Sequence, residues 1–163
     1  MTRMIRAGER LPNVDLAEIV GGDLTILRSE QLFAGKRAIV IGVPGAFTPV
    51  CSGRHLPDYV KAADQLTSQG YSLIACIAPN DPWTLAQWSR MLDPKGRIRM
   101  LSDGNLEFIR KAGLACDVGN LFLGERSRRY LMLLQDAVVM RLTVEPEVES
   151  FSCTRAQDVF SID

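Results

Sequence analysis

The sequence has no excess of charge of either sign, since its 163 residues include 19 Lys and Arg and 19 Asp and Glu. This balance excludes the strong basic field with which proteins attract nucleic acid or an anionic membrane surface. Long apolar runs are lacking too, so no membrane-spanning helix is expected, and residues 1–10 lack the apolar core of a secretory signal. We therefore expect a cytoplasmic protein with no nucleic-acid or membrane partner.

Histidine is almost absent, and the cysteines are few and dispersed. The single histidine is His55, and the four cysteines, Cys51, Cys76, Cys116 and Cys153, form neither a C-x-x-C pair nor a Cys/His cluster. Because the ligands of a structural metal are grouped at short spacing, no metal site is expected. A disulfide scaffold is not expected either, since a chain of this length can bury a core without cross-links. Dispersed cysteines in a reducing compartment are core fillers or redox groups.

The chain has ordinary globular composition, with 47% apolar and 23% charged residues. Its patterns predict a single domain over residues 1–163 with the element order β-α-β-α-β-α-β-β-α. The expected strands are two short ones around a turn at 21–23, three at 37–43, 71–78 and 98–101, and a pair at 129–134 and 138–144. The expected helices are a helical turn at 29–33, a helix that ends at 68, helices at 82–91 and 105–111, and a closing helix within 154–162. Residues 119–124 are expected to form an irregular connection. This order is typical of a thioredoxin-like α/β fold, with a central mixed β-sheet flanked by helices.

The most informative segment is 44–51, Pro-Gly-Ala-Phe-Thr-Pro-Val-Cys, which joins the strand 37–43 to the next helix. Thr48 followed by Pro49 is a helix-start signature, a hydroxyl N-cap and then proline at the first helical position. Cys51 is therefore expected in the first turn, where free backbone N–H groups and the helix dipole favour an anion. A thiol in this position tends toward the thiolate, which is the reactive form of cysteine.

This segment, continued by Ser52 and by His55-Leu56-Pro57, resembles the peroxidatic loop of peroxiredoxins, in particular those of the type II, or peroxiredoxin 5, subfamily. The resemblance extends over nearly the whole chain, in Asn80-Asp81-Pro82, in Trp88, in the run Arg-Ser-Arg-Arg-Tyr at 126–130 and in Val144-Glu145-Pro146. An ordered motif of this length is far more specific than a short glycine pattern.

The resemblance implies that Cys51 is the peroxidatic cysteine, which attacks a hydroperoxide and becomes a sulfenic acid. It implies that Thr48 places a hydroxyl near the sulfur and that Pro44 shields the sulfur from water. It also implies that Arg129 holds the thiolate charge and polarises the O–O bond. No metal, haem or flavin cofactor is implied.

Two assignments leave alternatives open: which arginine acts on the sulfur, and what His55 does. Arg126 and Arg128 could replace Arg129, although strand alternation puts Arg128 on the opposite face. His55 follows Cys51 by four residues and shares its helical face, and a Cys–His pair can activate a nucleophile. The family gives this position no such role, so we expect His55 to be a structural or partly exposed histidine.

The resemblance offers two candidates for the cysteine that resolves the sulfenic acid. Cys153 aligns with the resolving cysteine of animal-type members, which form an intramolecular disulfide, and Cys76 matches the second cysteine of plant-type members. Cys76 lies in an apolar strand, where an inert core thiol with a raised pKa is an equally good interpretation. Cys116, in the loop after Gly113, has no family role. Cys153 is preferred, and direct reduction by an external thiol stays open.

We therefore expect thiol-dependent reduction of hydrogen peroxide and small organic hydroperoxides, with thioredoxin, glutaredoxin or glutathione as the reductant. The resemblance also implies a homodimer with an interface near the Cys51 loop and Trp83. Two alternatives on the same fold stay open: a thiol–disulfide oxidoreductase, which the missing C-x-x-C pair disfavours, and a redox-switched binding protein or holdase.

Two residues depart from the family pattern. Val50 replaces a small or hydroxyl residue and is expected to narrow the approach to Cys51 or to alter dimer packing. Ala137 replaces the glycine common after Asp136, which best tolerates a positive φ in a hairpin turn. Neither change removes a catalytic atom.

Overall fold

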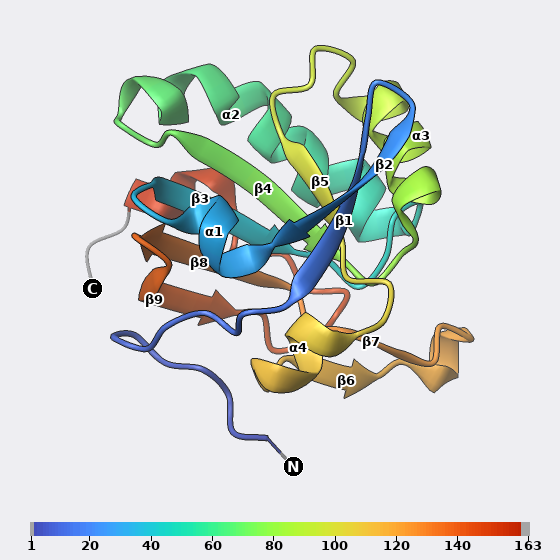
Figure 1. Ribbon diagram of the computed structural model, residues 1–163. Helices are drawn as coiled ribbons and strands as arrows, with labels where there is room; N and C mark the ends of the chain where they lie inside the picture. The colour runs from blue at the N-terminus through green and yellow to red at the C-terminus, as the bar shows by residue number, and fades with distance from the viewer. Residues whose placement is uncertain (1, 161–163) are drawn as a thin grey trace.

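In the computed structural model, which describes residues 2–160, a seven-stranded β-sheet runs through the centre of the molecule (Figure 1). The strand order is β2-β1-β5-β4-β3-β8-β9. The central strands β3, β4 and β5 are parallel, and the strands outside them pair antiparallel with their neighbours. The strands are β1 (Asp15–Val20), β2 (Asp23–Arg28), β3 (Arg37–Gly42), β4 (Leu73–Ala78), β5 (Arg99–Ser102), β8 (Tyr130–Gln135) and β9 (Val138–Val144). The expected mixed sheet with an antiparallel end is confirmed.

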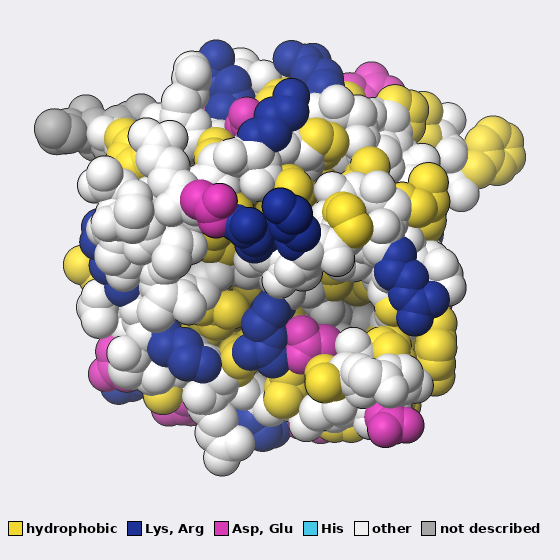
Figure 2. Space-filling model, turned by 90° about the horizontal axis from the view of Figure 1, so that it is seen from above, with side chains coloured by type: hydrophobic (Ala, Val, Ile, Leu, Met, Phe, Trp, Pro, Cys, Tyr) yellow, Lys and Arg dark blue, Asp and Glu magenta, His cyan; other side chains and the backbone are white. Residues whose placement is uncertain are grey.

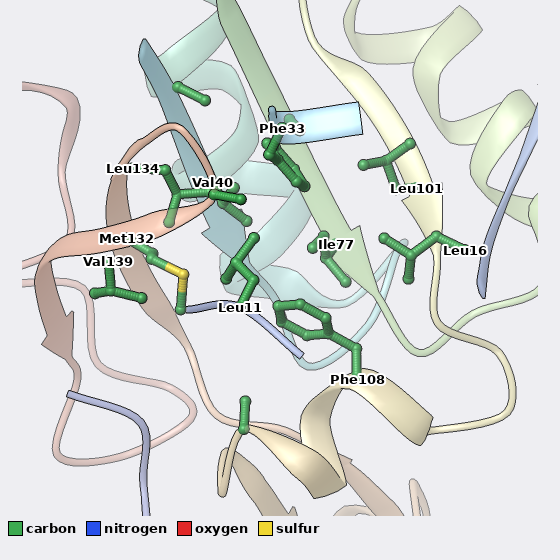
Figure 3. Close-up of a cluster of buried hydrophobic side chains, with 14 of the residues drawn as sticks. Leu11, Leu16, Phe33, Val40, Ile77, Leu101, Phe108, Met132, Leu134 and Val139 are labelled. Carbon is green, nitrogen blue, oxygen red and sulfur yellow. The ribbon is translucent and has the colours of Figure 1, made fainter. Parts of the chain in front are cut away.

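Helices cover both faces of this sheet, so the central strands are apolar throughout rather than alternating. Helices α2 (Leu56–Ser68) and α3 (Pro82–Leu92) cover one face, and the short helices α1 (Ser29–Phe33) and α4 (Glu107–Lys111) lie on the other (Figure 1). Residues of β3 alternate between two cores: Val40 packs with Phe33 and Phe108 in the core drawn in Figure 3, whereas Ile39 and Ile41 face α2 and α3. The second core holds Cys51 and Cys76.

The helix boundaries follow the signals read from the sequence. Helix α3 begins at Pro82 behind the cap residue Asp81, whose carboxylate accepts the Thr84 N–H at 2.8 Å. Helix α2 ends at Ser68 and is followed by Gly70 at φ +101°, a conformation that favours glycine.

The segment between residues 115 and 127 differs from the expectation. It forms a two-stranded ribbon of β6 (Ala115–Asp117) and β7 (Glu125–Ser127), with a 3-10 turn at Gly119–Leu121 between them. Cys116 therefore lies in a strand and not in a loop. The connection expected to be irregular, at 119–124, lies between the two strands and contains the 3-10 turn, so the prediction missed only the strands that flank it. Strands of three residues are too short to show a periodic pattern, which is why the sequence did not indicate them.

The last hairpin and the closing helix show smaller differences from the expectation. The strand expected to begin at residue 129 begins at Tyr130, and the closing helix is a 3-10 helix at Ala156–Phe160. The rest of its expected range, 161 and 162, lies outside the described residues. Asp136 and Ala137 form the hairpin turn with φ of +51° and +61°, so Ala137 adopts the conformation that glycine would favour. Its buried side chain packs in the first core, which compensates for the strain.

The surface carries charges of both signs. On the face drawn in Figure 2, Lys and Arg side chains lie among Asp, Glu and apolar side chains. Within residues 2–160, no helix combines the length and the apolarity needed to cross a bilayer.

Candidate active site

The sheet topology brings two distant segments to one edge. Strand β3 ends at Gly42 and continues into the loop that carries Cys51, while β8 runs antiparallel to β3 and pairs Tyr130 with Gly42. Arg129, the residue before β8, therefore lies at the same end of the sheet as the Cys51 loop. Gly42 permits the close approach, because a Cβ added there would lie 1.9 Å from Cε1 of Tyr130.

Cys51 lies in the first turn of a helical segment, as predicted, but from Cys51 onward the segment does not continue as an α-helix. The helix begins at Pro49, and Cys51–His55 forms a π-helical turn in which the Leu56 N–H donates to the Cys51 carbonyl. Such turns occur mostly as single bulges within α-helices and frequently at functional sites. The buried Trp88 of α3 donates its indole N–H to the Ser52 hydroxyl at 2.8 Å and so anchors the turn to the neighbouring helix.

Hydrogen bonds between side chains and the backbone fix the loop that precedes Cys51. The Ala46 N–H donates to Oδ1 of Asn80 at 2.8 Å, and Phe47 adopts φ +64°, which is strained for an aromatic residue. The Thr48 hydroxyl donates to the Gly45 carbonyl at 2.6 Å. Among the described residues, no helix N–H donates to this hydroxyl as it would to a cap. Thr48 therefore stabilises the loop through its bond to Gly45 and does not cap the helix.

Arg129 is a buried cation, 2% exposed, that reaches the sulfur of Cys51. Its Nη2 donates to Cys51 Sγ at 3.1 Å and to the Val148 carbonyl at 2.9 Å. Its Nε donates to the same carbonyl at 3.2 Å, and its Nη1 lies 2.9 Å from Nδ1 of His55. None of the ion pairs formed by residues 2–160 involves Arg129. A thiolate at Cys51 would be its one anionic acceptor.

The neighbouring arginines point to other partners. Arg126 donates from Nε to the Leu123 carbonyl at 2.9 Å, and Arg128 lines a cavity together with Cys116 and Glu125. Residues 128 and 129 lie between β7 and β8 and outside both strands, so the expected strand alternation does not apply to them. The contact itself identifies the residue, since the guanidinium beside the sulfur belongs to Arg129.

A small cavity of about 130 Å³ opens beside this contact. It is lined by Pro44, Thr48, Pro49, Val50, Leu121, Leu123, Arg129, Val148 and Glu149. Cys51 itself has no solvent-exposed area, so a ligand would approach it past Thr48 and Arg129. Leu121 and Leu123 come from the segment between β6 and β7, whose contribution to the site the sequence did not indicate. Val50, which departs from the family pattern, is one of the lining residues.

His55 is fully buried, so of the two expectations for this residue, a structural or a partly exposed histidine, the second is wrong. Burial lowers its pKa to about 3, with a further lowering by the Arg129 cation, while the Glu145 carboxylate acts in the opposite direction. The imidazole is therefore neutral near pH 7. Since its Nδ1 faces a permanent donor, His55 is not arranged as a general base toward Cys51.

The remaining cysteines differ in accessibility, and all four cysteines are free. Cys76 is fully buried in β4, where burial raises the pKa of its thiol well above the ordinary value. Cys153 is half-buried, and burial followed by the Glu145 carboxylate raises its pKa. Cys116 in β6 is also half-buried, and burial raises its pKa. The aromatic ring of Phe151 packs against His55 with ring centroids 5.1 Å apart, so the Cys153 segment adjoins the turn that carries Cys51.

Glu145 holds the Cys153 segment in place, a role the sequence did not reveal. Its buried carboxylate accepts the N–H groups of Ser152, Cys153 and Thr154 at 2.8–3.0 Å and the hydroxyls of Ser152 and Thr154. Burial alone would raise the pKa of this carboxyl, but these hydrogen bonds lower it to about 2. The Val144-Glu145-Pro146 motif contained the residue but gave no sign of its partners.

Comparisons with known proteins cover almost the whole chain. The Redoxin family model matches residues 6–158. The chain is similar to Peroxiredoxin-2E, chloroplastic, of Arabidopsis thaliana, with 39% identity over 98% of this chain and 69% of that protein. It is also similar to Peroxiredoxin-2B of the same plant, with 38% identity over 79% of each protein.

Among solved structures, reduced Prx3 from Vibrio vulnificus in complex with H2O2 superposes with a TM-score of 0.90 and 38% identity, over 96% of this chain and 97% of that chain. Peroxiredoxin 5 from Alvinella pompejana gives a TM-score of 0.80 and 36% identity, over 88% of this chain and 92% of that chain. These superpositions confirm the expected thioredoxin-like fold.

Proposed function

Because the chain belongs to the redoxin family and is a peroxiredoxin of the type II kind, a thiol-dependent peroxidase, we propose that its peroxidatic residue is Cys51 and that its substrates are hydrogen peroxide and small organic hydroperoxides. The observation that carries this proposal is the 3.1 Å contact between the buried Arg129 guanidinium and Cys51 Sγ. A buried cation without a carboxylate partner favours the ionised form of a thiol beside it.

The reaction transfers two electrons from sulfur to peroxide. The Cys51 thiolate attacks the terminal peroxide oxygen, the S–O bond forms as the O–O bond breaks, and the leaving oxygen takes up a proton to give water or an alcohol. Arg129 stabilises the charge that moves from sulfur to the leaving oxygen. The Thr48 hydroxyl donates its hydrogen bond to the Gly45 carbonyl, so its oxygen is free to accept a hydrogen bond from the peroxide. Pro44 is an apolar wall that limits water.

The size of the cavity supports small substrates. About 130 Å³ is well below the volume of a site for a drug-sized ligand, roughly 300–1,000 Å³. Its walls are mainly apolar, with Thr48, Arg129 and Glu149 as the polar or charged lining residues, and Arg129 contacts the sulfur of Cys51. A hydrogen peroxide molecule or a short alkyl hydroperoxide satisfies both conditions.

Reduced protein mixed with hydrogen peroxide in a stopped-flow instrument tests this proposal. We expect a second-order rate several orders of magnitude above that of free cysteine, and we expect Cys51→Ser to abolish turnover while Cys116→Ser retains it. Substantial peroxide turnover by Cys51→Ser, or a wild-type rate near that of free cysteine, would overturn the assignment. Insulin reduction without peroxide turnover would instead indicate a thiol–disulfide oxidoreductase.

For the second half-reaction, the proposal is that Cys153 resolves the sulfenic acid as an internal disulfide, which thioredoxin, glutaredoxin or glutathione then reduces. Cys153 lies in an irregular, half-exposed segment beside the Cys51 turn, whereas Cys76 is fixed in a buried strand. The turn and the Cys153 segment must rearrange for the two sulfurs to bond. The cytoplasm, which contains these reductants, is the proposed location.

Mass spectrometry after one equivalent of peroxide identifies the resolving residue. We expect wild-type protein and Cys76→Ser to form the internal bridge, and Cys153→Ser to stop at the sulfenic acid. A bridge that survives Cys153→Ser but is lost in Cys76→Ser would reverse the assignment, and no bridge in any variant would indicate an external thiol.

A further inference from the structure

His55 makes a contact that the peroxidase proposal does not use. It closes the π-helical turn that begins at Cys51, and its side chain has no exposed area. Its Nδ1 lies 2.9 Å from Nη1 of Arg129, while Nη2 of the same guanidinium donates to Cys51 Sγ at 3.1 Å. One turn of backbone thus supplies both the sulfur and a second acceptor to the same arginine.

The direction of this hydrogen bond follows from the chemistry of the two groups. The Arg129 guanidinium has donors and no acceptor, so Nη1 donates and Nδ1 of His55 accepts. The proton of the neutral imidazole is then on Nε2. That atom is buried, and the imidazole ring packs against the rings of Tyr59 and Phe151. The backbone of Thr154 acts on the ring by hydrogen bonding and offsets part of the lowering of its pKa.

A neutral acceptor differs from a carboxylate in its effect on the arginine. A carboxylate at this position would neutralise the Arg129 charge and weaken its attraction for a thiolate. The imidazole and the Val148 carbonyl orient the guanidinium by accepting three of its hydrogen bonds, yet neither carries a charge. The full positive charge therefore remains directed at Cys51.

We propose that His55 is a positioning residue, whose neutral Nδ1 holds the Arg129 guanidinium so that Nη2 is directed at the sulfur of Cys51. This inference rests on the proposed roles of Cys51 and Arg129. It assigns no proton transfer to His55, which acts through the arginine alone.

The single histidine allows a direct test on the wild-type protein. In nitrogen-15 NMR of untagged, histidine-labelled reduced protein, one pair of ring-nitrogen resonances belongs to His55. We expect the Nε2–H tautomer, with Nδ1 as an acceptor, and no titration between pH 5 and pH 8. A proton on Nδ1 at pH 7 would contradict the proposal, because Nδ1 could not then accept from Arg129.

Three variants test the consequence for the sulfur. His55→Leu removes the acceptor, His55→Asn keeps an oxygen acceptor near the place of Nδ1, and Tyr59→Phe is a matched control on the same helix that removes only the bond to the Thr154 carbonyl. We expect His55→Leu to slow the oxidation of Cys51 by peroxide about tenfold or more, the effect of one hydrogen bond to a charged group. We expect the pH midpoint of Cys51 alkylation to rise in parallel, His55→Asn to recover most of both, and Tyr59→Phe to match the wild type.

Each outcome decides between a positioning role and simple packing. A folded His55→Leu protein with wild-type oxidation rate and alkylation midpoint would overturn the inference, as would equal losses in His55→Leu and His55→Asn. If His55→Leu does not fold, the tautomer of the wild type and the behaviour of His55→Asn decide. Peroxide turnover by Cys51→Ser would contradict the proposed function itself. If Cys51→Ser is inactive but the His55 variants keep the wild-type oxidation rate and alkylation midpoint, only the inference about His55 is contradicted.

Discussion

At the residue scale, the site depends on the geometry of one guanidinium as well as on its charge. Arg129 places separate N–H groups on Cys51, His55 and the Val148 carbonyl, which a planar fork of five donors can do. A lysine ammonium has the same charge but no fixed fork. The arrangement therefore distinguishes arginine from lysine in a way that an exposed ion pair would not.

We predict that Arg129→Lys reduces the second-order rate with hydrogen peroxide by about 100-fold, comparable to the removal of one transition-state donor. Stopped-flow measurement on the reduced variant checks this. Arg126→Lys and Arg128→Lys are the matched controls, because neither side chain contacts Cys51 among the described residues, and both should keep the wild-type rate. A large loss in either control with little effect at residue 129 would transfer the role to that neighbour.

At the element scale, an irregular segment is ordered by one carboxylate. Residues 149–155 form neither helix nor strand, and their backbone N–H groups need acceptors. Glu145, just after β9, accepts three of these N–H groups and so fixes the segment that contains Cys153. This single side chain replaces the regular hydrogen bonding that the segment lacks.

We predict a specific loss of stability in acid from this carboxylate. Its folded-state pKa of about 2 lies below the ordinary 4.5, so the stabilisation is complete above about pH 4.5 and is lost as the pH falls toward 2. The amount is on the order of 3 kcal/mol. Urea unfolding at several pH values should show Glu145→Gln less stable than the wild type at pH 7 and less sensitive to acid between pH 5 and pH 3. The exposed Glu147→Gln is the control, and identical pH profiles for Glu145→Gln and the wild type would contradict the prediction.

At the scale of the whole molecule, two exposed aromatic side chains lie on adjoining segments. Phe47 in the Cys51 loop is 49% exposed and Trp83 at the start of α3 is 58% exposed. The Ala46–Asn80 hydrogen bond joins these two segments. Exposed apolar side chains at one place, next to a site, are typical of an interaction surface, and this is where we propose that a homodimer forms.

We predict that the wild type is a dimer in light scattering coupled to size-exclusion chromatography and that Trp83→Arg shifts it toward the monomer. Met91→Arg is a control on the same helix at a side chain that is more exposed, 68%, and it should remain dimeric. A monomeric wild type at all concentrations tested, or a fully dimeric Trp83→Arg, would exclude this interface.

The amino-acid pattern was sufficient for the parts of the fold that depend on local chemistry. Apolar runs gave the buried strands β3 and β4, and Asp81-Pro82 gave the start of α3, because caps and periodicity act within a few residues. The motif around Cys51 likewise placed the cysteine in the first turn of a helix. Short elements such as β6 and β7 form only because they pair with each other, so nothing in their own residues indicated them.

Contacts between distant residues come from the tertiary structure. The family resemblance implied that Arg129 acts on Cys51, and the pairing of Gly42 with Tyr130 is what brings the two together. The π-helical turn directs His55 at the same guanidinium, which no pattern in the sequence indicated. The Val148 carbonyl and the Glu145 carboxylate act through hydrogen bonds whose partners are fixed by packing and not by sequence spacing. Sequence by itself therefore determined which chemical groups this protein carries near residue 51, while the folded chain determined which of them meet, since hydrogen bonds and burial depend on distances that only the packed sheet sets.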